Sequence, residues 1–91
     1  MEPIEIPIDG VLDLHTFHPK EVHPLLYDYI AACREKNIYS LRIIHGKGTG
    51  VLKKRVHSIL KSHPHVISFT DAPPQAGGWG ATLAELKKGG E

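Results

Sequence analysis

A six-residue segment with three glycines, His45 to Gly50, separates an apolar run from a segment with helical periodicity. The apolar run is Leu41 to Ile44, and the helical segment is Val51 to Lys61. A strand that passes through glycines into a helix leaves backbone N–H groups pointing outward at the helix N-terminus, which binds anions. Because Lys47 lies among these glycines, the segment predicts a phosphate site. The structural alternative is a tight turn that uses glycine only for its positive φ.

The segment matches neither common nucleotide signature. Walker A needs four residues between its first Gly and the Gly-Lys-Ser/Thr end, whereas Lys47 directly follows Gly46. The dinucleotide pattern needs glycine where Val51 stands. The sequence therefore predicts no nucleotide cofactor.

The length of 91 residues suits one domain with one core. Cys33 is the one cysteine, so no disulfide can form within the chain. No run reaches the roughly 20 apolar residues of a membrane span, and none resembles a signal peptide. These features predict a soluble cytoplasmic protein without a membrane partner.

The charge of the chain is unevenly distributed. Residues 37–70 contain no Asp or Glu but carry six basic residues: Arg42, Lys47, Lys53, Lys54, Arg55 and Lys61. The rest of the chain has five basic and ten acidic residues, a net charge of −5. Such a basic half predicts contact with a polyanion, and a solvated helix face is the alternative.

The hydrophobic periodicity predicts two helices among four strands. Alternation from Ile4 to Leu14 indicates a half-buried strand with a possible break at Asp9-Gly10. Apolar residues three and four apart from Val22 to Cys33 predict a helix, regular from Pro24 and ending near Lys36-Asn37. The remaining predicted elements are a strand over Tyr39–His45, a helix over Val51–Lys61, and strands over Val66–Thr70 and Gly80–Leu86.

This βαβαββ order predicts an α/β (α+β) two-layer sandwich. Two right-handed crossovers place both helices on one face of a mixed four-stranded sheet and leave the other face open. The predicted division is an N-terminal arm or extra strand at 1–8, a domain at 9–86 and a flexible C-terminal tail at 87–91.

Asp13 and His15 lie two residues apart on the first predicted strand. Their side chains then emerge on one side, with Cα atoms about 6.5–7 Å apart. A carboxylate at this distance can orient an imidazole for acid or base catalysis, or both groups can hold a metal. His45 ends the neighbouring strand, so the two histidines should converge beside the glycine segment. A solvated or turn-capping pair is the alternative.

Trp79 stands between glycines in the segment Gly77 to Thr82. An exposed indole there could stack on a nucleic-acid base. The alternative is that Trp79 folds back over the edge of the core.

Three motifs together resemble the small MutS-related (Smr) domain family. They are Leu12-Asp13-Leu14-His15, His45-Gly46-Lys47-Gly48-Thr49-Gly50 and Gly77-Gly78-Trp79-Gly80-Ala81-Thr82. The resemblance covers about Asp9 to Leu86 and is that of a stand-alone member. It departs at Thr16, where the family often has glycine.

The resemblance implies a fold similar to the C-terminal domain of translation initiation factor three, and nicking or endonuclease activity on DNA or RNA. It implies that Asp13 and His15 serve cleavage and that the segment from His45 to Gly50 contacts nucleic acid.

The sequence hypothesis is therefore a nucleic-acid-binding endonuclease. Its candidate catalytic residues are Asp13, His15 and His45, and its candidate binding residues are Gly46, Lys47, Gly48, Thr49, Gly50, Lys53, Lys54, Arg55 and Trp79. With RNA the attacking group can be the 2′-OH, whereas with DNA a divalent ion such as Mg²⁺ at Asp13 and His15 becomes plausible. The alternatives are a non-catalytic DNA- or RNA-binding module and a site for a small phosphorylated metabolite.

Overall fold

The computed structural model describes residues 6–88. The strands are β1 (Val11–Asp13), β2 (Ser40–Ile44), β3 (Val66–Asp71) and β4 (Ala81–Leu86). The helices are α1 (Pro19–Glu35) and α2 (Val51–Ser62), and two short 3₁₀ turns, η1 (Pro74–Ala76) and η2 (Gly78–Gly80), precede β4. The predicted βαβαββ order is confirmed.

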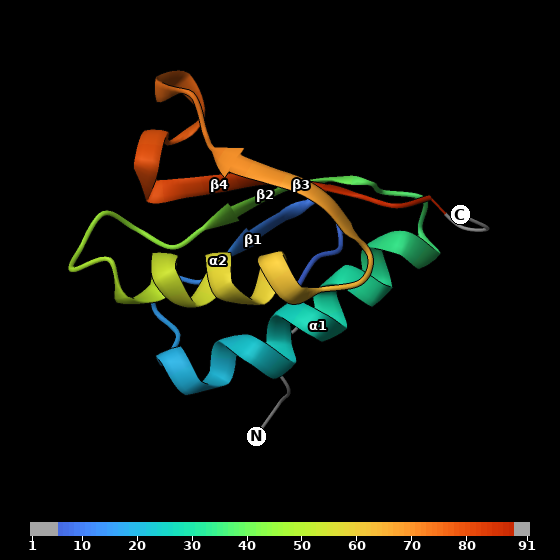
Figure 1. The fold of residues 1–91 in the computed structure, drawn as a ribbon, viewed down its shortest axis with the longest axis horizontal. Helices are drawn as coiled ribbons and strands as arrows, with labels where there is room; N and C mark the ends of the chain where they lie inside the picture. The colour runs from blue at the N-terminus through green and yellow to red at the C-terminus, as the bar shows by residue number, and fades with distance from the viewer. Residues whose placement is uncertain (1–5, 89–91) are drawn as a thin grey trace.

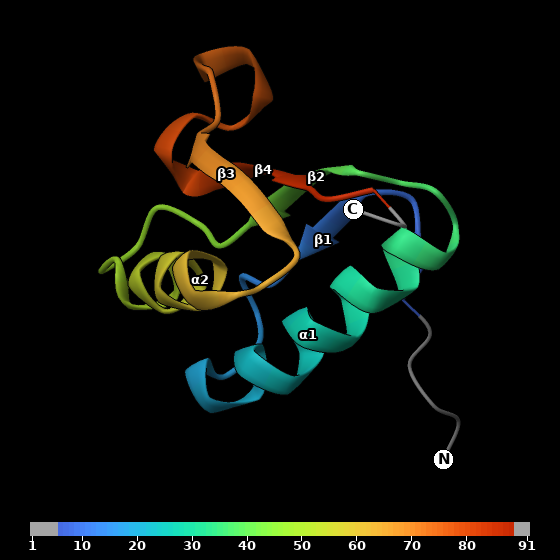
Figure 2. The ribbon, with the colours of Figure 1, turned by 45° about the vertical axis from the view of Figure 1, so that its right-hand side comes forward.

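The four strands form one mixed sheet in the order β1-β2-β4-β3. β1 runs parallel to β2, and β4 is antiparallel to both of its neighbours. Both helices cover the same face of this sheet (Figures 1 and 2). The predicted two-layer α/β fold is thus confirmed, and β4, the last strand in the chain, lies between β2 and β3.

The core lies between the sheet and the two helices. Alternate strand residues face the helices and are buried, among them Leu12, Leu41 and Ile43. The helices contribute their apolar sides, including Leu26 and the buried thiol of Cys33. The opposite sheet face carries partly exposed residues paired across the strands, such as Val11, Arg42 and Leu83.

Helix α1 begins earlier than the two prolines suggested. It starts at Pro19 rather than Pro24, so the predicted start of its regular part is wrong. His18 caps the first turn by accepting from the Lys20 N–H, while the Glu21 carboxylate accepts from the His18 N–H at 3.1 Å. This capping box, together with the complete burial of Val22, offsets the hydrogen bond that Pro24 cannot donate.

The described segments nearest the two ends, residues 6–8 and 87–88, lie outside the helices and strands. Residues 6–8 form no strand, although Ile6 and Ile8 pack against the core, and residues 1–5 lie outside the described part. At the other end, the backbone of Lys87 donates to His65 and accepts from the Arg34 side chain. Residues 89–91 of the predicted tail also lie outside the described part.

Candidate nucleic-acid site

The glycine segment forms an exposed loop between β2 and α2. Gly46 and Gly50 have φ values of +84° and +88°, a region that glycine adopts without steric penalty. Gly50 is the N-cap of α2 and provides no side-chain cap. The N-terminus of α2, with its partial positive charge, is therefore left to an external anion.

Asp13 and His15 form a hydrogen-bonded pair at the end of β1. The His15 Nδ1 lies 2.5 Å from the Asp13 Oδ1, which also accepts from the His15 backbone N–H at 3.1 Å. Partial burial raises the pKa of Asp13, but these hydrogen bonds outweigh it and leave the pKa below its usual value. Asp13 is therefore ionised at neutral pH. An ionised carboxylate only accepts, so the Nδ1 of His15 carries the proton and Nε2 faces away from the pair.

His15 and the glycine loop line one hollow of about 460 Å³. A Cβ built on Gly46 would lie 3.5 Å from the Cβ of His15, so the two segments are in van der Waals reach. The remaining lining residues are Phe17, Pro19, His45 and the stretch from Lys47 to Lys53. At position 16, Thr16 has no positive φ, because Asn37 alone among the described non-glycine residues has one. The turn that places His15 thus does not need glycine there.

His45 lies beneath the loop and is only 4% exposed. Its Nδ1 donates to the Gly46 carbonyl at 3.3 Å, so its Nε2 accepts from the Thr82 hydroxyl at 2.8 Å. Thr82 in turn accepts from the His57 Nε2 at 2.8 Å. Burial lowers the pKa of both histidines, which favours this neutral, directional chain. His45 thus has both ring nitrogens occupied by protein partners.

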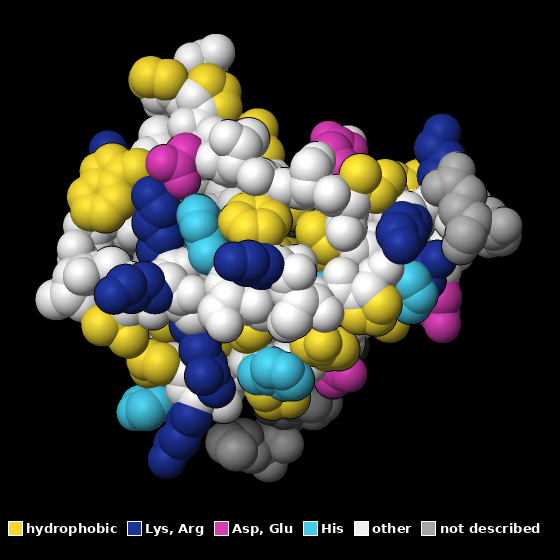
Figure 3. Space-filling view, viewed as in Figure 1, with side chains coloured by type: hydrophobic (Ala, Val, Ile, Leu, Met, Phe, Trp, Pro, Cys, Tyr) yellow, Lys and Arg dark blue, Asp and Glu magenta, His cyan; other side chains and the backbone are white. Residues whose placement is uncertain are grey.

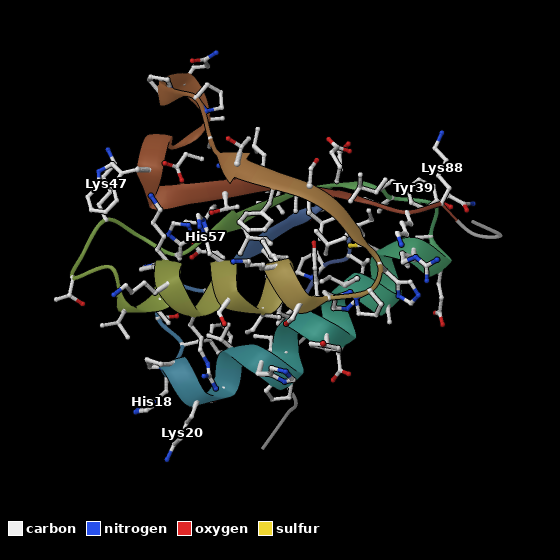
Figure 4. All side chains as sticks on the ribbon, viewed as in Figure 1. His18, Lys20, Tyr39, Lys47, His57 and Lys88 are labelled. Atoms are coloured by element: carbon white, nitrogen blue, oxygen red, sulfur yellow. The ribbon has the colours of Figure 1, made fainter. Side chains whose placement is uncertain are left out.

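Sequence reasoning missed two members of this chain. The apolar spacing of the α2 segment predicts that His57 points outward together with Lys53 and Lys54. Its side chain is instead 30% exposed and turns toward the sheet, so this prediction is wrong. Figure 4 shows His57 between α2 and the sheet, with Lys47 at the same end of the molecule. Thr82 stands in the third glycine-rich motif, which was the one available signal for it.

Lys47 and Lys53 lie on the side of the loop toward η2. The Lys47 Cγ would come within 2.8 Å of a Cβ on Gly80, so its alkyl chain rests against that glycine. The Lys53 Nζ is 3.0 Å from the Asp71 Oδ1 and 4.9 Å from the centre of the Trp79 ring. Trp79 is 48% exposed and is not part of the core. Asp71, at the end of β3, was not foreseen as a counter-charge.

Lys54 and Arg55 also reach a part of the surface that Lys53 does not line. They line a second hollow that also includes His18 and Lys20 at the start of α1. The two hollows adjoin, since both are lined by Pro19 and Val51. Figure 3 shows basic side chains running down this part of the surface, over α2 and the start of α1. Lys20 was not a sequence candidate.

Asp13 and His15 do not form a metal centre built from protein ligands alone. Their facing atoms are already joined by a hydrogen bond, which leaves one carboxylate oxygen and one imidazole nitrogen. Within residues 6–88, no three His, Cys, Asp or Glu side chains are grouped to hold a metal ion. A transition-metal site generally uses at least three protein ligands, whereas Mg²⁺ can be held by one or two carboxylates together with substrate phosphates.

Comparison with known proteins identifies relatives of this chain. The sequence profile of the family described as Smr domain matches residues 12–87. The protein named Endonuclease MutS2 from Staphylococcus carnosus is 43% identical over 76 residues, which are 84% of this chain and 10% of that protein. Endonuclease MutS2 from Lactococcus lactis subsp. cremoris is 41% identical over 80 residues, 88% of this chain and 10% of that protein. The chain thus spans about a tenth of the length of these relatives.

Two solved structures share the fold. The Smr domain of Thermus thermophilus MutS2 superposes with a TM-score of 0.83 at 33% identity, over 87% of this chain and 99% of that one. YdaL, a stand-alone small MutS-related protein from Escherichia coli, gives a TM-score of 0.81 at 25% identity, over 87% of this chain and 65% of that one. Neither described helix is both long and apolar enough to span a membrane.

Proposed function

The chain belongs to the Smr domain family, and from this premise we propose that it binds nucleic acid and cleaves its phosphodiester backbone. Relatives that match most of this chain are named endonucleases, although the match covers only a small part of each. The observation that carries the proposal is the position of His15. Its imidazole is held by Asp13 and lines the same hollow as the glycine loop.

The loop holds a phosphate of the backbone. The N-terminus of α2 supplies partial positive charge, and Lys47 adds a full charge beside it. A Cβ at Gly48 would meet nothing within 4 Å, so ligand oxygens can approach the backbone closely there. These groups stabilise the charge that grows on the phosphate oxygens during cleavage.

His15 exchanges the proton. Because Asp13 keeps Nδ1 protonated, the Nε2 of His15 accepts a proton from the attacking hydroxyl or returns one to the leaving oxygen. With RNA the attacking group is the 2′-hydroxyl, which bonds to phosphorus as the bond to the 5′-oxygen breaks. With DNA it is water, whose oxygen bonds to phosphorus as the bond to the leaving sugar oxygen breaks. A divalent ion would have to rest on Asp13 and substrate oxygens, and no step is assigned to it.

His45 acts on the loop rather than on the substrate. Its two ring nitrogens are bonded to Gly46 and Thr82, which positions the loop where it leaves β2. We therefore assign it a positioning role.

The test is cleavage of end-labelled DNA and RNA, with and without EDTA, by the wild type and by His15→Ala. We expect His15→Ala to lose at least about a hundredfold in cleavage rate, the usual contribution of an acid or base, with affinity changed less than about twofold. Asp28→Asn, an exposed position on α1, is the matched charge-removing control for Asp13→Asn. Asp13→Asn should reduce cleavage and Asp28→Asn should not.

The outcomes separate the alternatives. Equal cleavage by wild type and His15→Ala would reveal a contaminating nuclease and defeat the proposal. Tight binding without cleavage by the wild type would support the non-catalytic module. A ligand affinity that does not increase with oligonucleotide length would point to a small phosphorylated metabolite.

A further inference from the structure

The most exposed aromatic surface of the described chain lies beside the glycine loop. Trp79 is 48% exposed, on the turn η2. Its neighbour Gly80 accepts backbone hydrogen bonds from His45 at 3.0 Å and Gly46 at 2.9 Å. The indole therefore stands one residue from the point where the loop is fastened to β4, so ring and loop belong to one surface.

One face of the indole is already occupied. The Lys53 Nζ lies over the ring, 4.9 Å from its centre, in the geometry of a cation–π contact. The position of Lys53 is set in turn by Asp71, whose Oδ1 is 3.0 Å from the ammonium. Lys53 is 19% exposed, so this support is largely shielded from water. The exposed surface of Trp79 is accordingly a supported aromatic platform.

The charge around this platform selects its ligand. Asp71 forms an ion pair with Lys53, whereas Lys47 passes beside Gly78 and Gly80 and has no acidic partner among the described residues. A ligand that carries a flat, uncharged ring and a phosphate fits this surface, because the ring can lie on the indole and the phosphate can reach Lys47. A nucleotide has this chemistry: its base stacks on the indole while its phosphate reaches Lys47 and the loop.

We propose that the substrate carries an unpaired nucleotide next to the phosphate held by the glycine loop, with its base stacked on the face of Trp79 not covered by Lys53. This inference rests on the proposed function. In a duplex, the faces of the bases are stacked on one another, and only their edges reach a protein surface. An indole can meet a base face only where stacking is interrupted, as in a single strand, a flap, a bulge, a junction or a duplex end. Asp71 and Lys53 are positioning residues for the platform.

The experiment uses the one tryptophan of the chain as its own reporter. Intrinsic fluorescence is titrated with a 12-nucleotide oligothymidylate, with the same strand containing abasic sites, and with a fully paired duplex of that length. His15→Ala protein is used in parallel, so that strand cleavage does not distort the curves. We expect strong quenching by the oligothymidylate, and little by the abasic strand or the duplex.

Affinity is then compared by fluorescence anisotropy of labelled oligonucleotides. Trp79→Ala should weaken binding of the single strand by about ten- to a hundredfold, the range of one base–aromatic stack, and binding of the duplex by less than about threefold. Trp79→Phe should restore part of the loss. Ile67→Ala removes an exposed apolar side chain on β3, away from η2. It should change the affinity for neither the single strand nor the duplex.

Each outcome supports or overturns the Trp79 platform, the endonuclease proposal or both. Trp79→Ala binding the single strand as tightly as the wild type would overturn the inference, and so would equal quenching by the abasic strand. Absence of cleavage together with base-dependent quenching would defeat the endonuclease proposal but leave the platform established. Cleavage of duplex and single strand alike, unaffected by Trp79→Ala, would keep the endonuclease and remove the platform.

Discussion

The Nε2 of His45 accepts a hydrogen bond from the Thr82 hydroxyl across 2.8 Å, and both side chains are buried. Thr82 also accepts from His57 at the same distance, so one hydroxyl satisfies two imidazoles. The link joins the start of the glycine loop to β4 and α2. The shape of the loop therefore depends on residues far from it in the sequence.

Replacing this hydroxyl should destabilise the fold. Thr82→Val keeps the shape but leaves two imidazole nitrogens without a partner, which typically costs about 1–3 kcal/mol for a buried polar group. Urea unfolding measures the change, and Thr82→Ser, which keeps the hydroxyl, should recover most of it. A Thr82→Val protein as stable as the wild type would show that the hydrogen-bond chain contributes nothing.

The free energy of unfolding should fall as the pH drops below about 7. Burial lowers the pKa of His45, His57 and His63 in the folded protein. The unfolded chain therefore binds protons near the usual pKa of about 6.5 while the folded protein does not, and this difference favours unfolding. The slope is limited to about 1.4 kcal/mol per pH unit for each histidine.

Urea midpoints between pH 8 and pH 5 measure this pH dependence. Replacing His45, His57 and His63 with glutamine one at a time should flatten the curve in each case. His23→Gln, at an exposed position of α1, is the control. Stability that rose toward pH 5 would contradict the assignment of neutral imidazoles.

Gly48→Ala should separate binding from stability. A Cβ at this position meets no atom within 4 Å and the backbone has no positive φ, so unfolding free energy should change by less than about 0.5 kcal/mol. The methyl group would occupy the space that the phosphate needs, and we expect affinity for an oligonucleotide to fall about tenfold.

Gly80→Ala is the informative comparison for that variant. Its Cβ would come within 2.8 Å of the Lys47 Cγ and 3.5 Å of the Gly46 carbonyl carbon, so both stability and affinity should fall. Unchanged affinity in Gly48→Ala would mean that no phosphate approaches the backbone at this point of the loop.

Lys20 should contribute to nucleic-acid binding although the sequence did not single it out. It shares a hollow with Lys54 and Arg55, next to the hollow at the loop. Lys20→Gln should lower affinity for all sequences alike and reduce the slope of log affinity against log salt by about 0.7–0.9, the value for one phosphate contact. Lys61→Gln, exposed in the last turn of α2, serves as the control. Equal salt slopes for Lys20→Gln and Lys61→Gln would contradict a phosphate contact by Lys20.

Local pattern was sufficient to predict much of the fold. Helical spacing located α2 from Val51 to within one residue of its end, and the predicted strands over 39–45 and 80–86 agree with β2 and β4 to within one residue. The start of α1 at Pro19 was not predicted, because histidine is an unusual N-cap residue. The first strand shrank to Val11–Asp13, since apolar alternation shows that side chains are buried but not that the backbone is paired.

The candidate site also combines features that the sequence predicted with features that it did not. Asp13 and His15 share an orientation that two-residue spacing dictates, and the glycine loop follows from a strand leading into a helix. The surroundings of the basic residues could not be predicted from the sequence. Lys53 meets Asp71, whereas Lys54 and Arg55 face the start of α1.

By itself, the sequence determined the order of elements, the apolar positions of the helices and the strand–glycine–helix form of the loop, because these depend on neighbours within a few residues. Only the tertiary structure decided that Thr82 holds His45, that Asp71 fixes Lys53 and that Trp79 stands exposed beside them. All three depend on β4 pairing between β2 and β3, which sets Thr82 opposite Ile43 on one side and Asp71 on the other. That pairing joins strands distant in the chain, so no local pattern records it.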